Sequence, residues 1–399
     1  MVVLKFGGTS VGSIERIRHV AQLIKNTQEN EGPCCVVASA MSGETDRLVS
    51  LYKQISNDTH TLEYDLLVSS GEQASISLLC AALKALGLNS KPLLGYQAGF
   101  HTDQSRGRAK IQDIDPASVL ALTNENIIPI VAGFQGADHQ GNITTLGRGG
   151  SDTSAVALAA ALKAKRCDIY TDVSGVYSAD PRICPNAKRI KFMRFEEMME
   201  LASLGAKVLH PRSVEVAAKY KIPIRVLNTF EEGEGTLVGP QNNDFESPVV
   251  TALTTDNNLA LITLKNIKDN VDVFYKLFDG LSKEGIIVDI IVHSAVRSDG
   301  SLDLSFSIQK DDIAEVESLL PTLGWPIDHI DSSLTKVSLV GSGMRSHTGV
   351  AARVFKTLAQ NEIRVVCTTT SEIKISCVVA SNQAETALKA LHEEFQVDI

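Results

Sequence analysis

The sequence predicts an α/β protein whose first part has a mostly parallel central sheet flanked by helices and whose tail forms two smaller α+β modules. Apolar runs alternate with helix-like segments up to about residue 230, a polar stretch at 239–248 interrupts them, and a weak duplication follows. Such alternation favours parallel strands with helices on both faces of the sheet. We therefore expect a domain at 1–238, a linker at 239–248, and modules at 249–330 and 331–399.

The beginning of the chain has the pattern of a βαβ unit. An apolar run at 2–6 ends at Gly7-Gly8, Ser13 can cap a helix with apolar residues at helical spacing, and a second apolar run follows at 34–38. The alternation continues through a helix, a buried strand, an alanine-rich helix and another strand, expected at 73–86, 127–134, 153–164 and 167–171.

The duplication in the tail defines the two modules. Four apolar residues, at 278, 281, 286 and 288, each match an apolar residue at one constant offset (355 − 278 = 77). In both copies a helix runs into a strand. The second strand and last helix are expected at 302–308 and 313–320 in one copy, and at 373–379 and 384–395 in the other. The order is βαββα.

Composition excludes several classes of protein. The 399 residues are 44% hydrophobic and 21% charged, which is typical of a folded globular chain. The net charge of −9 and the absence of a basic block argue against a nucleic-acid partner. Seven cysteines without a CxxC pair read as reduced core residues, and the scattered histidines show no metal spacing. Because no leader or long apolar run is present, we expect a cytoplasmic protein without a membrane partner.

Two glycine-rich motifs are candidates for binding anions. KFGGTS at 5–10 places Lys5 at a strand end beside two glycines and two hydroxyls, which suits phosphate, although a tight turn with a solvated lysine is about as probable a reading from the motif alone. LGRGGSDTS at 146–154 precedes a helix of small residues. Simple helix capping by Ser151 or Asp152 is the alternative, but capping does not need Arg148, whereas a grip on a carboxylate or phosphate does.

Other polar segments are less specific. Glu72 has capping-box spacing from Ser69, which alone favours a structural role. The segments at 39–46 and 170–182 can be ordinary turns or parts of a nucleotide site, and Lys207 can be a phosphate contact or a solvated lysine. VSLVGSGMRS at 337–346 lacks the third glycine of a dinucleotide turn, but its backbone amides can meet a small ligand.

The motifs together resemble those of the aspartokinases, in the same order over about 230 residues: KFGGTSV, SAMSGETD, SSGEQ, GFQG, TTLGRGGSDT, YTDVSGVYSADPR and GAKVLHPR. The tail resembles the paired ACT modules of that family and ends without a homoserine dehydrogenase half. The resemblance implies an amino-acid-kinase fold with two ferredoxin-like ACT modules. It also implies transfer of the ATP γ-phosphoryl group, with Mg²⁺, to the β-carboxylate of L-aspartate.

The resemblance also assigns residues, position by position. Those implied to bind ATP are Lys5, Phe6, Gly7, Gly8, Thr9, Ser10, Ser39, Thr171, Asp172, Tyr177, Arg182 and Lys207. Those implied to bind aspartate are Thr45, Glu72, Arg148, Gly149, Gly150, Ser151 and Asp152. Lys5 and Asp152 would be catalytic. Charge complementarity raises Glu72 above its capping role, because the substrate ammonium needs a carboxylate and the α-carboxylate suits the Arg148 fork.

For the tail, the resemblance implies an amino-acid effector between modules and a homo-oligomer formed through them. The positions that match ligand contacts are Val350, Ala351, Glu362, Ile363, Ser371 and Glu372. The first module departs from the family pattern, with 268–271 in place of a Pro-Gly turn and His293 in place of glutamine, although Asp289 remains available for an effector ammonium. We expect lysine as the effector, and threonine as the second choice.

Two other functions are compatible with parts of the sequence. Kinases of acetylglutamate or glutamate share the catalytic fold but lack the paired tail. A non-catalytic amino-acid sensor would use the tail alone, and the presence together of Lys5, Arg148 and Asp152 argues against it.

Overall fold

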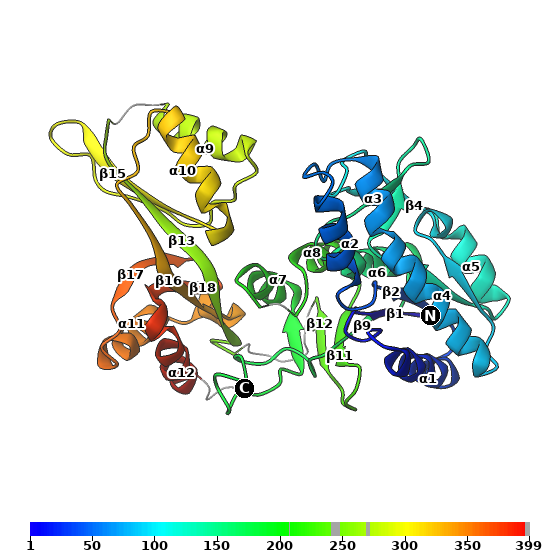
Figure 1. Cartoon of the computed structure of the whole chain (residues 1–399). Helices are drawn as coiled ribbons and strands as arrows, with labels where there is room; N and C mark the ends of the chain where they lie inside the picture. The colour runs from blue at the N-terminus through cyan, green and yellow to red at the C-terminus, as the bar shows by residue number, and fades with distance from the viewer. Residues whose placement is uncertain (207, 241–247, 269–271, 396–399) are drawn as a thin grey trace. The chain divides into compact units, whose positions relative to one another are not determined.

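The structure is a computed structural model that describes residues 1–206, 208–240, 248–268 and 272–395 (Figure 1). It divides into two compact units, one formed by 1–177, 189–203 and 207–245, and the other by 178–188, 204–206 and 246–399. Both have the predicted class, α/β for the first and α+β for the second. The short segment 178–188 thus belongs to the second unit although the chain around it belongs to the first.

An eight-stranded sheet forms the centre of the first unit, in the order β10-β12-β11-β9-β1-β2-β6-β3. All neighbouring strands are parallel except β11 and β12. The strands are β1 (Val2–Phe6), β2 (Cys34–Ala38), β3 (Ser90–Leu93), β6 (Ile128–Ala132), β9 (Cys167–Thr171), β10 (Phe192–Arg194), β11 (Ile224–Asn228) and β12 (Thr236–Gly239).

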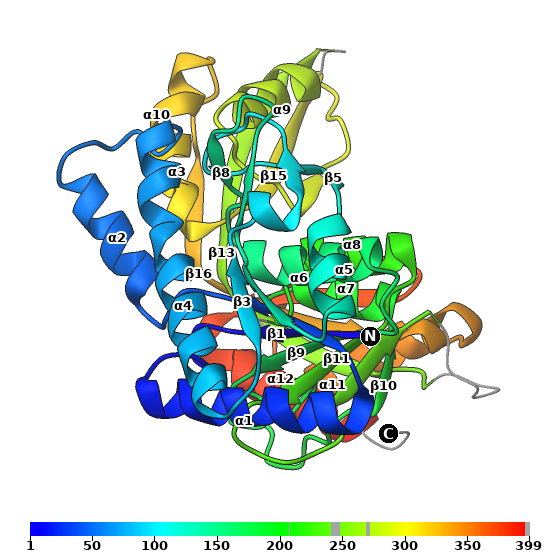
Figure 2. The ribbon, with the colours of Figure 1, turned by 90° about the vertical axis from the view of Figure 1, so that its right-hand side faces the viewer.

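Helices cover both faces of this sheet, as Figure 2 shows for β1 and β9 between α1 and α6. Alternate residues of β1, Val2, Leu4 and Phe6, pack with α1 (Ile14–Glu31) and α4 (Ser70–Ala85) in one core cluster. Because successive strand residues face opposite sides, the side chain of Lys5 points toward α6 (Gly150–Ala161) instead. The alternation therefore separates the core residues of β1 from its one charged residue.

A second, four-stranded sheet of the first unit has the order β5-β4-β7-β8. Its strands are β4 (Phe100–Thr102), β5 (Ile111–Ile114), β7 (Gln135–Ala137) and β8 (Ile143–Thr145). The remaining helices of this unit are α2 (Glu44–Lys53), α3 (Leu62–Val68), α5 (Ala117–Asn124), α7 (Phe195–Ser203) and α8 (Pro211–Tyr220). Strand β8 leads directly into the segment at 146–149 and α6, so this sheet supports the glycine-rich motif.

The two C-terminal modules share one antiparallel sheet, in the order β14-β15-β13-β16-β18-β17. Its strands are β13 (Ala252–Lys268), β14 (Ile291–His293), β15 (Ser301–Ile308), β16 (His329–Val340), β17 (Val365–Thr370) and β18 (Lys374–Ala380). The predicted βαββα order is confirmed in both copies. The sharing of one sheet was not predicted, and it arises because the 17-residue β13 pairs with both β15 and β16.

Each module has its own helix pair and its own core (Figure 1). The pairs are α9 (Val273–Lys283) with α10 (Ile313–Thr322), and α11 (Val350–Gln360) with α12 (Ala384–Phe395). Helices α9 and α11 begin at the predicted offset (350 − 273 = 77). Segment 178–188 joins the second core through Ala179 and Cys184, and a buried hydrogen bond of 2.9 Å links Ser178 Oγ to His392 Nε2.

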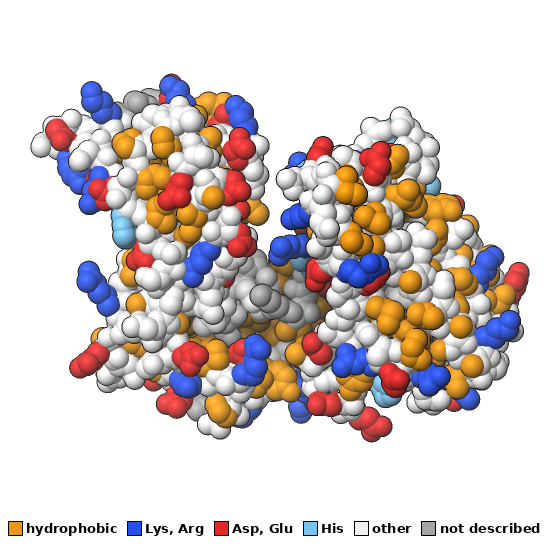
Figure 3. Space-filling model, in the orientation of Figure 1, with side chains coloured by type: hydrophobic (Ala, Val, Ile, Leu, Met, Phe, Trp, Pro, Cys, Tyr) orange, Lys and Arg blue, Asp and Glu red, His pale blue; other side chains and the backbone are white. Residues whose placement is uncertain are grey.

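Apolar side chains are also visible on the surface of the first unit, where α1 and α4 lie (Figure 3). Ile14 and Leu78 line an apolar groove of about 470 Å³ between these helices. Among the described residues, one helical stretch, 62–85, has the length and composition of a membrane span, and half of its most apolar 18-residue window is buried. All seven cysteines are free of disulfides, and five are buried.

Asp168 on β9 provides a test of the first unit's stability. This fully buried carboxylate accepts hydrogen bonds from Arg166 Nε at 2.8 Å and Arg225 Nη2 at 2.6 Å. Asp168→Asn should lower the free energy of unfolding by about 3 kcal/mol, because it removes the fully buried anion that Arg166 and Arg225 share and leaves them only the partly exposed Glu31. Urea denaturation would measure the change beside Asp113→Asn, an exposed control on β5. A loss below about 1 kcal/mol would contradict a structural role for the cluster.

Candidate active site at the carboxyl edge of the parallel sheet

The candidate site lies where four neighbouring parallel strands end. Phe6 pairs in register with Ala38 on β2 and with Tyr170 on β9, and Ala38 pairs with Ala132 on β6. The residues that follow these positions, at 7, 39, 133 and 171, therefore emerge at one edge of the sheet. Ligands of open parallel sheets bind at this edge, where loops and helix N-termini meet.

Lys5 and Asp152 form an ion pair at this edge. Lys5 Nζ lies 2.6 Å from Asp152 Oδ1, and the two side chains are only 10% and 15% exposed. Asp152 stands in the first turn of α6, where backbone N–H groups have no partner within the helix. The pair thus places a cation beside a helix N-terminus, an arrangement that suits a phosphate group.

The glycines of KFGGTS allow two loops to approach each other. A Cβ atom on Gly8 would lie 2.9 Å from the carbonyl oxygen of Ala40, and Ser42 N donates to Gly8 O at 3.1 Å. Ser10 is buried, and its Oγ lies 2.7 Å from Thr229 Oγ1. The ring of Phe6 stacks on Tyr170 in the core, so only its backbone faces this edge.

Glu72 does not form the capping box that its spacing suggested. Ser69 has helical dihedral angles, and its Oγ donates to Leu66 O at 3.1 Å. Instead, Glu72 Oε1 accepts the backbone N–H of Ala40 at 3.1 Å, and Oε2 has no hydrogen-bond partner among the described residues. Burial raises the pKa of this 3% exposed carboxyl to about 8. A ligand ammonium would supply the missing partner.

The capping alternative for the 146–154 motif is also wrong. The first turn of α6 has Gly149 as its N-cap and no side-chain cap, so Ser151 and Asp152 are left for other contacts. Gly149 has φ +67°, and a Cβ atom there would lie 2.0 Å from His210 Cγ. Arg148 is exposed and makes no hydrogen bond or ion pair within the described chain. Its guanidinium is therefore available for an anionic ligand.

The sequence reading missed the residues that support this motif. His210 caps α8 and packs against Gly149, and burial lowers the pKa of its imidazole. Arg212 donates to Leu146 O at 2.7 Å and to Ala109 O at 2.9 Å. Both belong to the GAKVLHPR motif, in which only Lys207 is predicted as a site residue.

The other predicted residues of the site are less closely gathered. Thr45 lies in the first turn of α2, and Thr171 Oγ1 donates to Asp172 Oδ1 at 3.1 Å. Tyr177 is half-buried and forms a β-bridge with Arg189. Arg182 belongs to the second unit, where its 88% exposed side chain pairs with Asp180. Lys207 lies outside the described residues, as do 269–271 of the first module's variant turn.

A second cavity, of about 580 Å³, lies in the second module at the N-terminus of α11. Its lining is Met344, Arg345, His347, Gly349, Val350, Ala351, Thr370, Ser371, Glu372 and Ile375. Four of the six effector positions predicted in the second module thus line one cavity, whereas Ile363 is buried in the core and Glu362 does not line the cavity. Arg345, which the sequence reading did not assign, lies 3.0 Å from Glu372 through Nε and Oε2.

Asp289 was expected to be available for an effector ammonium, but its carboxylate already has a partner. It forms an ion pair with Lys336, a buried residue of β16. Lys336 Nζ also lies 3.7 Å from Asp256 Oδ2. Asp289 therefore already neutralises a buried cation, and it does not line the α11 cavity.

Comparison with known proteins gives one consistent result. The amino acid kinase family matches residues 1–228, and an ACT domain matches 337–395. The aspartate kinase of Pseudomonas putida is 45% identical, with 100% of this chain and 98% of that protein covered. The aspartokinase of Geobacillus stearothermophilus is 46% identical, with 99% and 97% covered.

Solved structures agree with the sequence relatives. Escherichia coli aspartokinase III in complex with aspartate and ADP is 27% identical with a TM-score of 0.84, and the match covers 99% of this chain and 100% of that one. The same enzyme in complex with lysine and aspartate has 28% identity and a TM-score of 0.80, with 99% of both chains covered. This chain is accordingly a phosphotransferase that belongs to the amino acid kinase family, among the aspartokinases with a C-terminal ACT region.

Proposed function

We propose that the enzyme transfers the γ-phosphoryl group of ATP to the β-carboxylate of L-aspartate, giving 4-phospho-L-aspartate and ADP. This is the first step toward lysine, threonine and methionine. The proposal depends on one observation. A single edge of the sheet carries a cation for phosphates, a buried carboxylate for an ammonium, and an unengaged guanidinium for a carboxylate. The names of the relatives support the same substrate.

Aspartate matches the charges at this edge. Its ammonium would meet the unpartnered Oε2 of Glu72, and its α-carboxylate would accept two parallel hydrogen bonds from Arg148. Thr45 and Ser151 would supply hydroxyl groups beside the bound substrate. Holding the two α-substituents leaves the β-carboxylate as the group presented to the nucleotide.

Lys5 and Asp152 would serve the transfer itself. The β-carboxylate is already ionised at neutral pH, so no general base is needed, and no covalent enzyme intermediate is proposed. Two anions must instead be brought together. Lys5 would neutralise charge that develops on the transferred group, while Asp152 holds the ammonium of Lys5 in place. The backbone N–H groups at the start of α6 would add further donors.

We propose that Mg²⁺ enters with ATP. Magnesium prefers oxygen ligands and usually keeps phosphate oxygens and water in its coordination sphere. The described residues contain no group of three or more His, Cys, Asp or Glu side chains that could hold a metal by itself. The oxygen-rich edge at Asp152 and Asp172 suits an ion held mainly by the nucleotide, and the bound ion would neutralise phosphate charge.

We further propose that an amino acid, with lysine the first choice, binds the α11 cavity and inhibits the enzyme. ACT-mediated allosteric control is supported by the family match, and a relative's structure contains lysine. Arg345 and Glu372 offer the opposite charges that an amino acid needs. The edge strands β14 and β17 expose Ile291 and Val366, which supports a homo-oligomer through this sheet. A cytoplasmic location is also part of the proposal.

Lys5→Ala should reduce kcat by about 100-fold or more, because it removes the cation that stabilises transition-state charge. ATP-dependent formation of aspartyl hydroxamate would measure the rate. Lys91→Ala, which changes an exposed lysine on β3, is the matched control and should keep the wild-type kcat. Normal turnover by the Lys5 variant would remove Lys5 from the mechanism.

Glu72→Ala and Arg148→Ala should raise the KM for aspartate roughly 10- to 150-fold, since each change removes a charge-assisted bond to a group that does not react. The KM for ATP should change little. Initial-rate kinetics with each substrate varied in turn would show the difference. If the KM for ATP rose instead, the two subsites would be reversed.

The raised pKa of Glu72 adds a pH dependence to this prediction. Near neutral pH the carboxyl is mostly protonated, but an ammonium ligand favours the ionised form, so binding releases a proton. The wild-type KM for aspartate should therefore fall as pH rises toward about 8, by up to roughly tenfold per pH unit, and level off above it. Glu72→Gln should lack this dependence. Calorimetry in buffers of different ionisation enthalpy would detect the released proton independently.

Lysine should bind and inhibit the enzyme, with a coupling of ~1 to 3 kcal/mol that weakens aspartate binding about 5- to 150-fold if control acts on affinity. Reciprocity then requires aspartate to weaken lysine binding by the same factor. Calorimetric titration of lysine with and without aspartate would test both statements, and threonine would be titrated in parallel. An absence of lysine binding would exclude lysine, whereas unchanged inhibition of Glu372→Ala would reject only the α11 site.

A further inference from the structure

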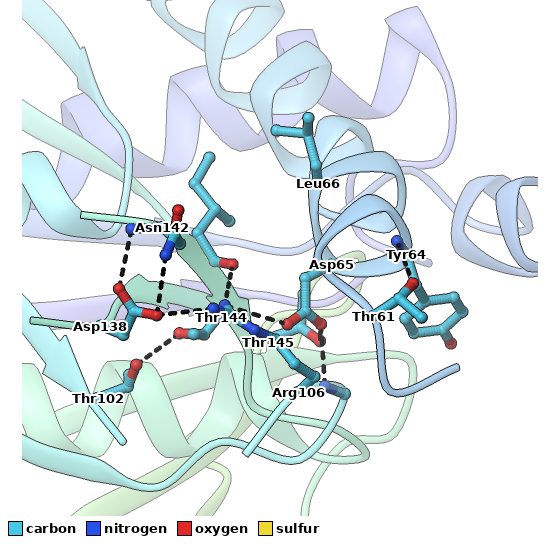
Figure 4. A network of polar contacts seen from close by, with 12 residues as sticks. Thr61, Tyr64, Asp65, Leu66, Thr102, Arg106, Asp138, Asn142, Thr144 and Thr145 are labelled. Atoms are coloured by element: carbon cyan, nitrogen blue, oxygen red, sulfur yellow. Dashed lines mark hydrogen bonds and ion pairs between the residues drawn. The ribbon is translucent and has the colours of Figure 1, made fainter. Parts of the chain in front are cut away.

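Figure 4 shows a network of polar contacts that includes Asp65, Arg106 and Thr145. Its central residue is Asp65 of α3, whose side chain is fully buried. One carboxylate oxygen, Oδ1, accepts hydrogen bonds from Thr145 Oγ1 at 2.5 Å and from the backbone N–H of Gly107 at 3.0 Å. Asp65 therefore joins α3 to the end of β8 and to the loop after β4.

Arg106 extends the network to the β7–β8 hairpin. Its Nη2 donates to Asp138 Oδ2 at 2.7 Å, and its Nη1 donates to Ile143 O at 2.9 Å. The same Nη1 lies 3.9 Å from Asp65 Oδ2, an oxygen without a hydrogen-bond partner in the described chain. One guanidinium is thus shared by two buried carboxylates. Removing these three charged groups from water costs desolvation free energy, so the cluster is weak evidence for a role in stability alone.

The network reaches the Arg148 loop through a few ordered residues. Thr145 is the last residue of β8, and the following Leu146 is held by its N–H to Phe134 O at 2.8 Å and by Arg212 at its carbonyl. Gly147 has φ +75°, and a Cβ atom there would lie 3.0 Å from Gly107 O. Gly107 is also the residue whose backbone N–H donates a hydrogen bond to Asp65. The backbone before Arg148 is therefore set by the partners of Asp65.

We propose that Asp65 is a positioning residue for aspartate binding. It does not touch the substrate, but it sets the backbone from which Arg148 reaches the α-carboxylate. This inference rests on the proposed function. A planar guanidinium makes two parallel bonds only when it is aligned, so a small displacement of its backbone is costly. The contacts of Asp65 end three residues before Arg148, and Gly149 against His210 fixes the other side.

Two variants test the proposal by steady-state kinetics with each substrate varied. Asp65→Asn keeps the shape of the side chain but replaces one acceptor oxygen by a donor that faces Arg106. It should raise the KM for aspartate ~10-fold, with kcat and the KM for ATP within about twofold of wild type. Thr145→Val removes only the hydroxyl group that donates a hydrogen bond to Asp65, and it should raise the KM for aspartate about threefold. Thr145→Val decides the matter if Asp65→Asn fails to fold.

Asp168→Asn is the matched control, because Asp168 is equally buried and paired with arginines but lies on β9. It should lower stability and leave the KM for aspartate unchanged. A further arm adds Asp65→Asn to Arg148→Ala, where it should have no additional effect on that KM, because Asp65 acts through Arg148.

The possible outcomes separate the inference from the proposed function. A wild-type enzyme that does not phosphorylate aspartate would overturn the proposed function and, with it, this inference. An active wild type whose KM for aspartate is unchanged in both variants would overturn the positioning role alone. The positioning role would also be overturned if Asp65→Asn raised the KM for aspartate by the same factor in the Arg148→Ala background as in the wild type.

Discussion

The ion pair between Lys5 and Asp152 is the interaction on which the candidate site depends. It joins the first strand of the sheet to the first turn of α6, and so it links the proposed nucleotide side of the site to the proposed substrate side. Both groups are largely buried, and each would be costly without the other. The strand period explains why the pair can form: Leu4 and Phe6 occupy the core, while Lys5 faces the opposite side. An incoming polyanion would meet a cation already positioned by its carboxylate partner.

Three buried carboxylates in the same unit show how surroundings decide what an acidic residue does. Asp168 has two guanidinium partners, which occupy both of its carboxylate oxygens. Asp65 shares the guanidinium of Arg106 with Asp138. It accepts its hydrogen bonds from the backbone N–H of Gly107 and the hydroxyl of Thr145. Glu72 has a single backbone donor and no cation, so burial raises its pKa to about 8. The fewer partners the protein provides, the more a ligand can contribute.

The regulatory unit is built from one sheet that two modules share. Strand β13 pairs with strands of both modules, so neither module has a complete sheet without it. Segment 178–188 contributes Ala179 and Cys184 to the second core, while covalent bonds join it to Tyr177 and Arg189 of the first unit. The chain that follows the proposed nucleotide loop is therefore part of the regulatory core itself.

Local and periodic features of the structure could be predicted from the sequence. The strands at 2–6, 34–38 and 167–171 and the helix cap at Ser13 were expected from neighbouring residues, because strand runs, helical spacing and capping are local. The 77-residue offset of α9 and α11 was expected from the internal duplication. The ordered motifs also placed Lys5, Glu72, Arg148 and Asp152 in one candidate site.

Only the tertiary structure decided what the ambiguous polar residues contact. Spacing alone favoured capping for Glu72, and capping was the alternative for Asp152, because a cap needs only residues three or four positions away. Their actual partners, Ala40 and Lys5, lie far from them along the chain. The link from Asp65 to Thr145 and the packing of His210 on Gly149 have no local signal at all. Such contacts arise when packed elements bring distant segments together, and no sequence period or spacing records them.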